Sequence, residues 1–514
     1  MLLALSERIR EIDMYSSDVL GIPLRDLMAR SGKAVDAVLR EHVKPGASVI
    51  ILAGSGNNGG DGYALAELIM NDYNVKVYDI FSAGQKTEVS KYFHDKYVSL
   101  GGLVLPFAYT PEILSEIKGS DCIVDAVFGT GFVGQMPDRL GELIGCVNSS
   151  TSAYKIAIDV PLGVNADDGS ISDAYACSVD VTVALSFIKP GLVSYPARSF
   201  VGKIVYDDIG LPLDKITEHF DFKYRLIDKP LAVSLLPVRR EDGNKGTFGS
   251  LFVITGSKKY RGAAHLSLEA AVRGGVGRVN YFGTQALVNE LLQKLPEVIY
   301  ESFLDEELKE ADVIRAVELS APHNAVLLGS GSSVTDELYA LTTKLLLTEG
   351  APLILDADAI NALADRKKEA LDILKHAKRT VILTPHPLEF SRISGHTVAL
   401  VQQRRIELAK AFASEYNCIL VLKGAGTVVT DGKEVLINST GSSALSKAGS
   451  GDVLAGFLSA LVASGISPLY ASALAVYYHG LAADVLRDEL SVFGVTPSDL
   501  PREIARQIAR ASEE

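Results

Sequence analysis

The run Lys447-Ala448-Gly449-Ser450-Gly451-Asp452 combines small residues with one carboxylate, and an uncharged stretch follows it. Glycine and serine let the main chain come close to an anion, and a helix after Asp452 would point its free N–H groups and positive dipole end at that anion. A carboxylate here would repel a phosphate, so Asp452 must act on a neighbouring group. A base that takes a proton from a hydroxyl as a phosphoryl group arrives fits this position. The run therefore predicts phosphoryl chemistry, with Asp452 as a catalytic residue.

Other polar or glycine-rich segments follow expected strands in the C-terminal half, where ligands of open parallel sheets bind. They are Gly256-Ser257 with Tyr260-Arg261-Gly262-Ala263, Gly329-Ser330-Gly331, Thr384-Pro385-His386-Pro387 and Lys423-Gly424-Ala425-Gly426-Thr427. Two prolines fix the main chain around His386 and direct its imidazole, although a structural histidine is the common alternative. Asp356 and Asp358 could order water around magnesium, but helix N-capping explains Asp358 equally well.

The segment Gly54-Ser55-Gly56-Asn57-Asn58-Gly59-Gly60-Asp61-Gly62 lies between an expected strand and an expected helix. Its five glycines would let main-chain amides surround a phosphate, and a helix from Gly62 would add its dipole. The spacing differs from the usual GxGxxG pattern of dinucleotide-binding loops. Side-chain oxygens of Asn57, Asn58 and Asp61 could coordinate a hard cation. The alternative is a solvated loop, which fits the strand–loop–helix setting less well.

Two aspartates end expected strands and precede glycine-containing turns. Asp125 comes before Phe128-Gly129-Thr130-Gly131, and Asp159 comes before Val160-Pro161-Leu162-Gly163. Because both strands belong to one sheet, the two carboxylates should face the same crevice. One would serve as a proton-transfer group and the other as a cation ligand. Turn formation or helix capping is the alternative explanation.

Short apolar strands alternate with helical segments along the chain, which predicts an α/β protein with a parallel sheet between helices. In the N-terminal part, the expected helices are Ser6–Leu20, Leu24–Glu41, Gly62–Asn71, Thr87–Leu100 and Asp138–Ser149, and the expected strands are Ser48–Ala53, Val75–Ile80, Cys122–Asp125, Lys155–Asp159 and Val181–Ala184. We interpret this part as a Rossmann-like three-layer domain.

A second α/β series begins after a mixed, proline-containing stretch at Leu211–Pro237. Its expected strands are Leu251–Thr255, Arg278–Phe282, Ala325–Leu328, Pro352–Asp356, Thr380–Thr384 and Ile419–Lys423, followed by a hairpin around Asp431-Gly432. We place the boundary near residue 220, giving domains 1–220 and 221–514. The halves show no repeat, so the chain is interpreted as a fusion.

The net charge of −13 argues against nucleic acid or an anionic membrane as the main partner. The four scattered cysteines predict reduced core thiols. Val453–Ala483 carries no charged residue, but Gly465 and Pro468 divide it into pieces too short to span a membrane. The opening apolar run is too short for a signal peptide. We therefore expect a cytoplasmic enzyme.

In the N-terminal half, NNGGDG, VDAVFGTG and IDVPLG occur in this order, so residues 6 to 214 resemble the YjeF N-terminal family, the NAD(P)H-hydrate epimerases. The resemblance implies that Asp159 is catalytic and touches the substrate at its reacting end, and that Asn58, Asp125 and Leu162 bind potassium. Leu162 replaces the usual serine of DVPSG. If that serine binds potassium through its side chain, the site is weakened here, whereas a main-chain carbonyl ligand would be unchanged. Lys189 falls near a lysine common in the family. The residues implied in hydrate binding, besides Asp159, are Asn57, Asn58, Gly59, Gly60, Asp61, Gly129, Thr130, Gly131, Phe132, Val133, Gly134 and Gln135.

The C-terminal half contains the motifs GSKKYRGA, TPHPLE, VLKGAGTVV and GSGD. Through these motifs, residues 225 to 508 resemble the YjeF C-terminal family of the ribokinase-like superfamily. That family comprises ADP- or ATP-dependent NAD(P)H-hydrate dehydratases, so the resemblance implies a ribokinase-like α/β domain that uses magnesium. Ser330 and Ser332 depart from a loop more often GPGLG, and Leu388 from TPHPGE. The implied hydrate contacts are Ala263, Gly331, His386 and Asp452, and the implied nucleotide contacts are Lys423, Gly424, Ala425, Gly426, Thr427, Gly449, Ser450 and Gly451.

Together the resemblances predict a bifunctional enzyme that epimerises the R and S forms of NAD(P)H hydrate and dehydrates the S form at the expense of ADP or ATP. By analogy we expect a homo-oligomer. One alternative is a ribokinase-like small-molecule kinase with an accessory nucleotide-binding domain, which leaves NNGGDG unexplained. The other is a binding or scaffold role for the N-terminal half, which the presence of Asp125 and Asp159 disfavours.

Overall fold

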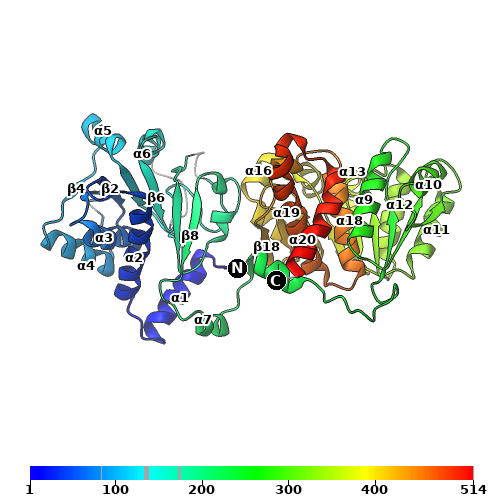
Figure 1. The fold of residues 1–514 in the computed structure, drawn as a ribbon, viewed down its shortest axis with the longest axis horizontal. Coiled ribbons are helices and arrows are strands. Elements are labelled where there is room, and N and C mark those ends of the chain that lie inside the picture. The colour runs from blue at the N-terminus through cyan, green and yellow to red at the C-terminus, as the bar shows by residue number, and fades with distance from the viewer. Residues whose placement is uncertain (83, 132–137, 172–174, 513–514) are drawn as a thin grey trace. The chain divides into compact units, whose positions relative to one another are not determined.

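The computed structural model describes residues 1–82, 84–131, 138–171 and 175–512, and it separates into two compact units (Figure 1). The first unit comprises Leu2–Arg225, and the second comprises Leu226–Glu514 together with Met1. A short antiparallel ladder pairs β1 (Leu2–Leu3) with β9 (Tyr224–Ile227). Parallel sheets and helices occur in both units, which confirms the predicted α/β class.

A parallel sheet forms the centre of the first unit, with the strand order β4-β3-β2-β5-β6-β7-β8. Its order reverses direction between β2 and β5, and ligands bind at such a switch point outside the carboxyl ends of the strands. The edge strands β4 and β8 were not predicted, because neither is fully buried and so neither has the continuous apolar run of the central strands. The strands are β2 (Ser48–Ala53), β3 (Asn74–Asp79), β4 (Val104–Pro106), β5 (Cys122–Ala126), β6 (Tyr154–Ile158), β7 (Val181–Leu185) and β8 (Lys203–Asp207).

Helices cover both faces of this sheet, as the predicted three layers require. Buried side chains of α1 to α4 pack on one face, and those of α5 and α6 pack on the other. The helices are α1 (Ser6–Asp18), α2 (Leu24–His42), α3 (Asn57–Ile69), α4 (Glu88–Ser99), α5 (Pro111–Gly119), α6 (Asp138–Ser149) and α7 (Leu213–His219).

Helix α3 begins at Asn57, five residues earlier than the expected start at Gly62, so the NNGGDG residues form its first turns and not a loop. A Cβ atom at Gly59 would lie 2.0 Å from the carbonyl oxygen of Gly54, and one at Gly62 would lie 2.8 Å from the Cβ of Ala126. These glycines therefore let α3 start directly against β2 and β5. Because glycine has a low helix propensity, the helix was predicted to begin only after these glycines.

The sheet of the second unit has the order β18-β17-β16-β15-β14-β13-β10-β11-β12. Strands β16, β17 and β18 form an antiparallel meander, and the other strands are parallel. The order reverses between β10 and β13, which marks a second switch point. The strands are β10 (Ser250–Ile254), β11 (Arg278–Gly283), β12 (Ile299–Ser302), β13 (Ala325–Leu328), β14 (Leu353–Leu355), β15 (Val381–Leu383), β16 (Ile419–Leu422), β17 (Val428–Thr430) and β18 (Val435–Asn438).

The largest core of this unit joins the sheet to α9, α18, α19 and α20. The uncharged stretch folds as α18 and the first part of α19, with the break at Gly465 and Pro468 that the sequence predicts. Among the described residues, no helix is long and apolar enough to cross a bilayer, and the four cysteines are buried and free. The helices are α8 (Lys229–Leu235), α9 (Arg261–Arg273), α10 (Gln285–Leu292), α11 (Glu310–Ser320), α12 (Asp336–Leu347), α13 (Asp358–Asp365), α14 (Lys367–Lys375), α15 (Pro387–Ser394), α16 (Val398–Gln403), α17 (Arg405–Glu415), α18 (Ser450–Ala463), α19 (Pro468–Gly494) and α20 (Leu500–Ser512).

Candidate functional site

A cavity of about 420 Å³ opens at the switch point of the first unit. Residues of α1, α2 and α3 line it together with the loops that follow β2, β5, β6 and β7. Among the predicted hydrate-binding residues, those that line it are Asn57, Asn58, Asp61, Gly129, Thr130, Gly131 and Asp159. Gly59 and Gly60 are buried in α3, whereas Phe132, Val133, Gly134 and Gln135 lie outside the described residues.

Asn58 is the unsatisfied polar group of this cavity. Its side chain is buried, yet neither its oxygen nor its nitrogen has a hydrogen-bond partner among the described residues. A Cβ placed on Gly129 would lie 3.4 Å from Asn58 Cβ and 3.5 Å from Asp159 Oδ2, so these three residues adjoin. An unpaired buried amide costs about 1–3 kcal/mol. The amide of Asn58 is therefore available to bind a polar ligand or a cation.

Asp125, near the end of β5, and Leu162, in the loop after β6, are joined by a hydrogen bond. The Asp125 carboxylate accepts hydrogen bonds from Val127 N at 3.2 Å and from Leu162 N at 2.6 Å. Burial raises the pKa of Asp125 to about 6, although these main-chain hydrogen bonds oppose the rise. The Leu162 side chain is fully buried and its carbonyl oxygen accepts from Cys177 N at 2.8 Å, so it can offer a cation a carbonyl oxygen but no side-chain oxygen.

Asp159 and Lys189 form a buried ion pair in the wall of the cavity. Asp159 has a φ of 66°, a left-handed conformation that is strained for a residue with a Cβ. Its Oδ1 accepts from Lys189 Nζ and from Leu185 N, the latter at 3.2 Å. Lys189 is 1% exposed and also donates to the Leu185 carbonyl at 2.8 Å. The pair places a carboxylate at the cavity wall, and the charge of Lys189 offsets that of Asp159.

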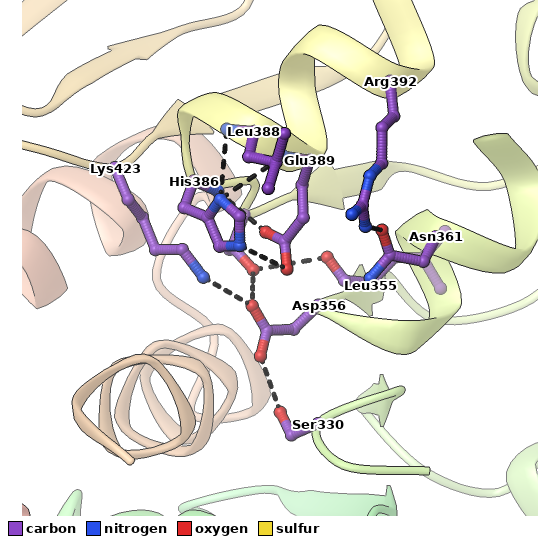
Figure 2. Close-up of polar contacts among 10 residues, drawn as sticks. Ser330, Leu355, Asp356, Asn361, His386, Leu388, Glu389, Arg392 and Lys423 are labelled. Atoms are coloured by element: carbon purple, nitrogen blue, oxygen red, sulfur yellow. Dashed lines mark hydrogen bonds and ion pairs between the residues drawn. The ribbon is translucent and has the colours of Figure 1, made fainter. Parts of the chain in front are cut away.

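Figure 2 shows the corresponding centre of the second unit, in which polar groups from several strand ends meet at Asp356. Its Oδ1 accepts from Thr384 Oγ1 at 2.7 Å and from Lys423 Nζ at 2.9 Å, and its Oδ2 accepts from Ser330 Oγ at 2.8 Å. Asp358 begins α13, and its carboxylate accepts from Ser333 N at 2.9 Å. Asp356 thus joins the loops that follow β13, β15 and β16.

The phosphoryl loop leads into α18, which begins at Ser450, two residues before Asp452, and not after it as expected. Gly449 has a φ of 105°, which favours glycine, and it allows the helix to start abruptly. A Cβ on Gly451 would lie 3.2 Å from Lys423 Nζ, so this ammonium faces the loop. Burial raises the pKa of Asp452 to about 7, and Asp356 adds to the rise while Lys423 opposes it.

His386 is the N-cap of α15, and its Nδ1 accepts from the main-chain N–H groups of Leu388 and Glu389 at 3.1 and 3.3 Å. Its Nε2 lies 3.3 Å from Glu389 Oε1. Burial and nearby Lys423 lower the pKa of His386, so the imidazole is neutral at pH 7. The helix cap explains its position, while about half of its side chain stays exposed to solvent.

The other predicted dehydratase residues include Ala263 with Gly331, and the turn from Lys423 to Thr427. Gly331 meets Ala263 directly, since a Cβ on Gly331 would lie 2.7 Å from that of Ala263. Lys423 to Thr427 form the turn after β16, in which Thr427 Oγ1 donates to the Gly424 carbonyl at 2.9 Å. Buried Arg405 supports the turn by donating to the carbonyls of Leu422 and Lys423 at 2.8 and 3.0 Å.

Comparisons with known proteins match each half of the chain to a different family model. Residues 24–191 match the model of the YjeF-related protein N-terminus, and residues 251–506 match that of NAD(P)H-hydrate dehydratase. The chain is 32% identical to the bifunctional NAD(P)H-hydrate repair enzyme of Moorella thermoacetica over 94% of its length and 92% of the relative, and 30% identical to that of Escherichia coli over 96% and 92%. The chain belongs to the family of bifunctional NAD(P)H-hydrate repair enzymes. The predicted family membership is therefore confirmed.

A solved member of this family's dehydratase branch supports the fold of the second unit. It is the ADP/ATP-dependent NAD(P)H-hydrate dehydratase of Bacillus subtilis, co-crystallised with ATP and Mg²⁺. It is 30% identical, with a TM-score of 0.50, and the match covers 56% of this chain and 98% of that protein.

Three carboxyl or hydroxyl groups of the two candidate sites were not predicted from the sequence. Glu389 is buried beside Asp356 and Lys423, and burial raises its pKa. Asp13 on α1 and Ser31 on α2 line the cavity of the first unit. Asp13 could have been found, because it lies four residues after buried Ile9 and so on the buried face of its helix.

Replacing Lys189 with methionine should leave the Asp159 carboxylate buried without its ion pair. We expect a loss of about 3–5 kcal/mol in the free energy of unfolding of the first unit, because breaking one partner of a buried pair is far costlier than breaking an exposed one. Denaturant unfolding of the full chain measures this. The matched change Lys223→Met, in the exposed pair with Asp221, should cost less than about 1 kcal/mol.

Adding Asp159→Asn to Lys189→Met should recover part of the loss, since the stranded charge is then removed. Equal effects of Lys189→Met and Lys223→Met would contradict the buried pair.

Proposed function

We propose that the chain repairs hydrated nicotinamide cofactors: its first unit epimerises the R and S forms of NAD(P)H hydrate, and its second unit dehydrates the S form to NAD(P)H at the expense of ADP or ATP. One observation carries this proposal. The chain holds both a phosphoryl loop that bears a carboxylate, at Asp452, and a separate cavity whose wall presents unpaired Asn58 beside Asp159.

The dehydration needs a better leaving group than hydroxide. Water added across the 5,6 double bond of the nicotinamide ring leaves a hydroxyl at C6, and a phosphate ester of that oxygen can be expelled by the lone pair of the ring nitrogen. Asp452 takes the hydroxyl proton as the phosphoryl group arrives, and its pKa of about 7 suits a general base. Ala263, Gly331 and His386 lie around the hydrate.

The donor nucleotide is placed along Lys423 to Thr427, with its reacting phosphate at the amides of Gly449 to Gly451. The start of α18 directs its N–H groups there, and Lys423 adds a positive charge that Asp356 holds in position. Asp356 and Asp358 would order water around a magnesium ion. Magnesium would neutralise the charge that develops on the transferring phosphoryl group.

The epimerisation makes both hydrates available to a dehydratase that accepts one. Asp159 lies beside Gly129 and Asn58 and contacts the reacting end of the hydrate, while the ion pair with Lys189 keeps its carboxylate in place. Asn58, Asp125 and the Leu162 carbonyl provide the oxygen ligands of a potassium ion. The unpaired Asn58 oxygen fits this ion, which would hold negative oxygens of the substrate close together.

Two substitutions separate the activities. Asp452→Asn should lower nucleotide-dependent dehydration of the S hydrate by about 10²–10⁴-fold, because the general base is lost, and leave epimerisation unchanged. Asp159→Ala should abolish epimerisation and leave dehydration unchanged. Chromatography of the epimers and NADH absorbance measure the two reactions. Loss of both activities in either variant would contradict independent sites, and phosphate transfer to an unrelated alcohol without NADH recovery would indicate a kinase.

The dehydration rate should depend on pH through Asp452. A base must be ionised, so kcat/KM for the S hydrate should rise about tenfold per pH unit below pH 7 and level off above it. Steady-state rates between pH 5 and 9 test this. A profile that stays flat through pH 7 would remove Asp452 from the proton transfer.

Potassium should accelerate epimerisation when it replaces choline at constant ionic strength, whereas dehydration should not respond. Asp125→Asn should weaken this response, because it removes a charged ligand. Equal epimerisation rates in potassium and choline would discard the proposed ion site.

A further inference from the structure

Asp13 places a third carboxylate in the cavity of the first unit. It lies on α1, which precedes the residues that the family model matches, and it faces the same space as Asp61 of α3 and Asp159. The charges of the three groups interact with one another and with Lys189. Asn58, buried and unpaired in the same wall, independently indicates that a ligand occupies this space.

The three carboxylates cannot all be ionised at low cost. Among the described residues that line the cavity, the cations are Lys189, which binds Asp159, and Arg10, which is exposed on α1. Burial and the nearby Asp159 carboxylate raise the pKa of Asp61 well above its ordinary value. Burial raises the pKa of Asp13 to about 6, although Lys189 opposes the rise. Both shifts favour the protonated forms of Asp61 and Asp13, and Asp13 exchanges its proton near neutrality.

Ser31 of α2 lies beside Asp61 in the cavity wall. Its Oγ donates to the Leu27 carbonyl at 3.1 Å, and its hydrogen bond with the Asp61 carboxyl lowers the pKa of that group, against the rise caused by burial. The carboxyl of Asp61 therefore has a hydrogen-bond partner of its own in the wall, which leaves Asp13 to exchange a proton near neutrality.

In the proposed epimerisation a hydroxyl proton leaves while the ring nitrogen gains one, and two groups in one cavity can carry out both transfers at the same time. Asp159, held in an ion pair by Lys189, is the group placed to accept a proton. We propose that Asp13 is the second proton-transfer residue of the epimerase site and acts as the acid opposite Asp159. This inference rests on the epimerase activity proposed above.

The proton and electron movements balance in both directions. Asp159 takes the proton of the C6 hydroxyl, the C6–O bond becomes a carbonyl, and the electron pair of the N1–C6 bond moves to N1, which takes the proton of Asp13. Rotation about the C5–C6 bond presents the other face of the aldehyde. N1 then attacks C6 and returns its proton to Asp13, while Asp159 returns its proton to the oxygen.

The test is Asp13→Asn in the full chain, with the R hydrate and no nucleotide. We expect epimerisation to fall about 10²-fold or more, with dehydration of the S hydrate unchanged. Asp13→Glu should recover part of the rate. Asp18→Asn is the matched control, since Asp18 is exposed on the same helix and does not line the cavity, and it should keep the full rate.

The pH profile of the unmodified chain provides a second test that needs no variant. An acid must be protonated, so kcat/KM for epimerisation should fall by about tenfold per pH unit above pH 6, opposite in sign to dehydration. Wild-type epimerisation with a flat profile, or full activity of Asp13→Asn, would overturn the role of Asp13. Absence of epimerisation in the unmodified chain would instead overturn the proposed function.

Discussion

The arrangement of the second unit depends on the Asp356 carboxylate. Parallel strands end side by side, and the loops that follow them would diverge if no group held them together. Asp356 accepts hydrogen bonds from Ser330, Thr384 and Lys423, so one buried charge fixes three loops at once. The ion pair with Lys423 offsets part of the free-energy cost of removing this carboxylate from water. The same ammonium group faces the start of α18. The structural contact and the electrostatics of the phosphoryl loop are therefore inseparable.

The two sites share one electrostatic arrangement at the carboxyl ends of their strands. In each, a carboxylate is buried against one lysine and a few neutral donors, and further carboxylates nearby are pushed toward the protonated form. Asp13 and Asp452 reach pKa values of about 6 and 7 in this way. The chain as a whole is acidic, so local geometry and not the overall charge must attract phosphate groups.

The sequence predicted the central strands within one or two residues, because a strand buried on both faces is a continuous apolar run. It also located Asp125, Asp159 and Asp356 correctly at strand ends, whereas Asp452 lies in the first turn of α18 and not before it. Edge strands such as β4 lacked that apolar signal, and the start of α3 was obscured by glycines that serve packing. The charged neighbours of a residue could not be predicted either. That Lys423 binds Asp356, or that the charges of Asp13 and Asp159 interact, depends on how segments far apart in sequence fold together. The roles of the individual site residues remain proposals.

The core of the second unit has a consequence for how the chain is made on the ribosome. Its early strands, β10, β11 and β13, bury one face against α18, α19 and α20, which are translated last. The seven-stranded sheet lies wholly within the first unit and can form once the residues of that unit have emerged. The second unit must wait with apolar strands uncovered until nearly the whole polypeptide is released. Nascent chains stalled before α18 should therefore be the species that chaperones bind.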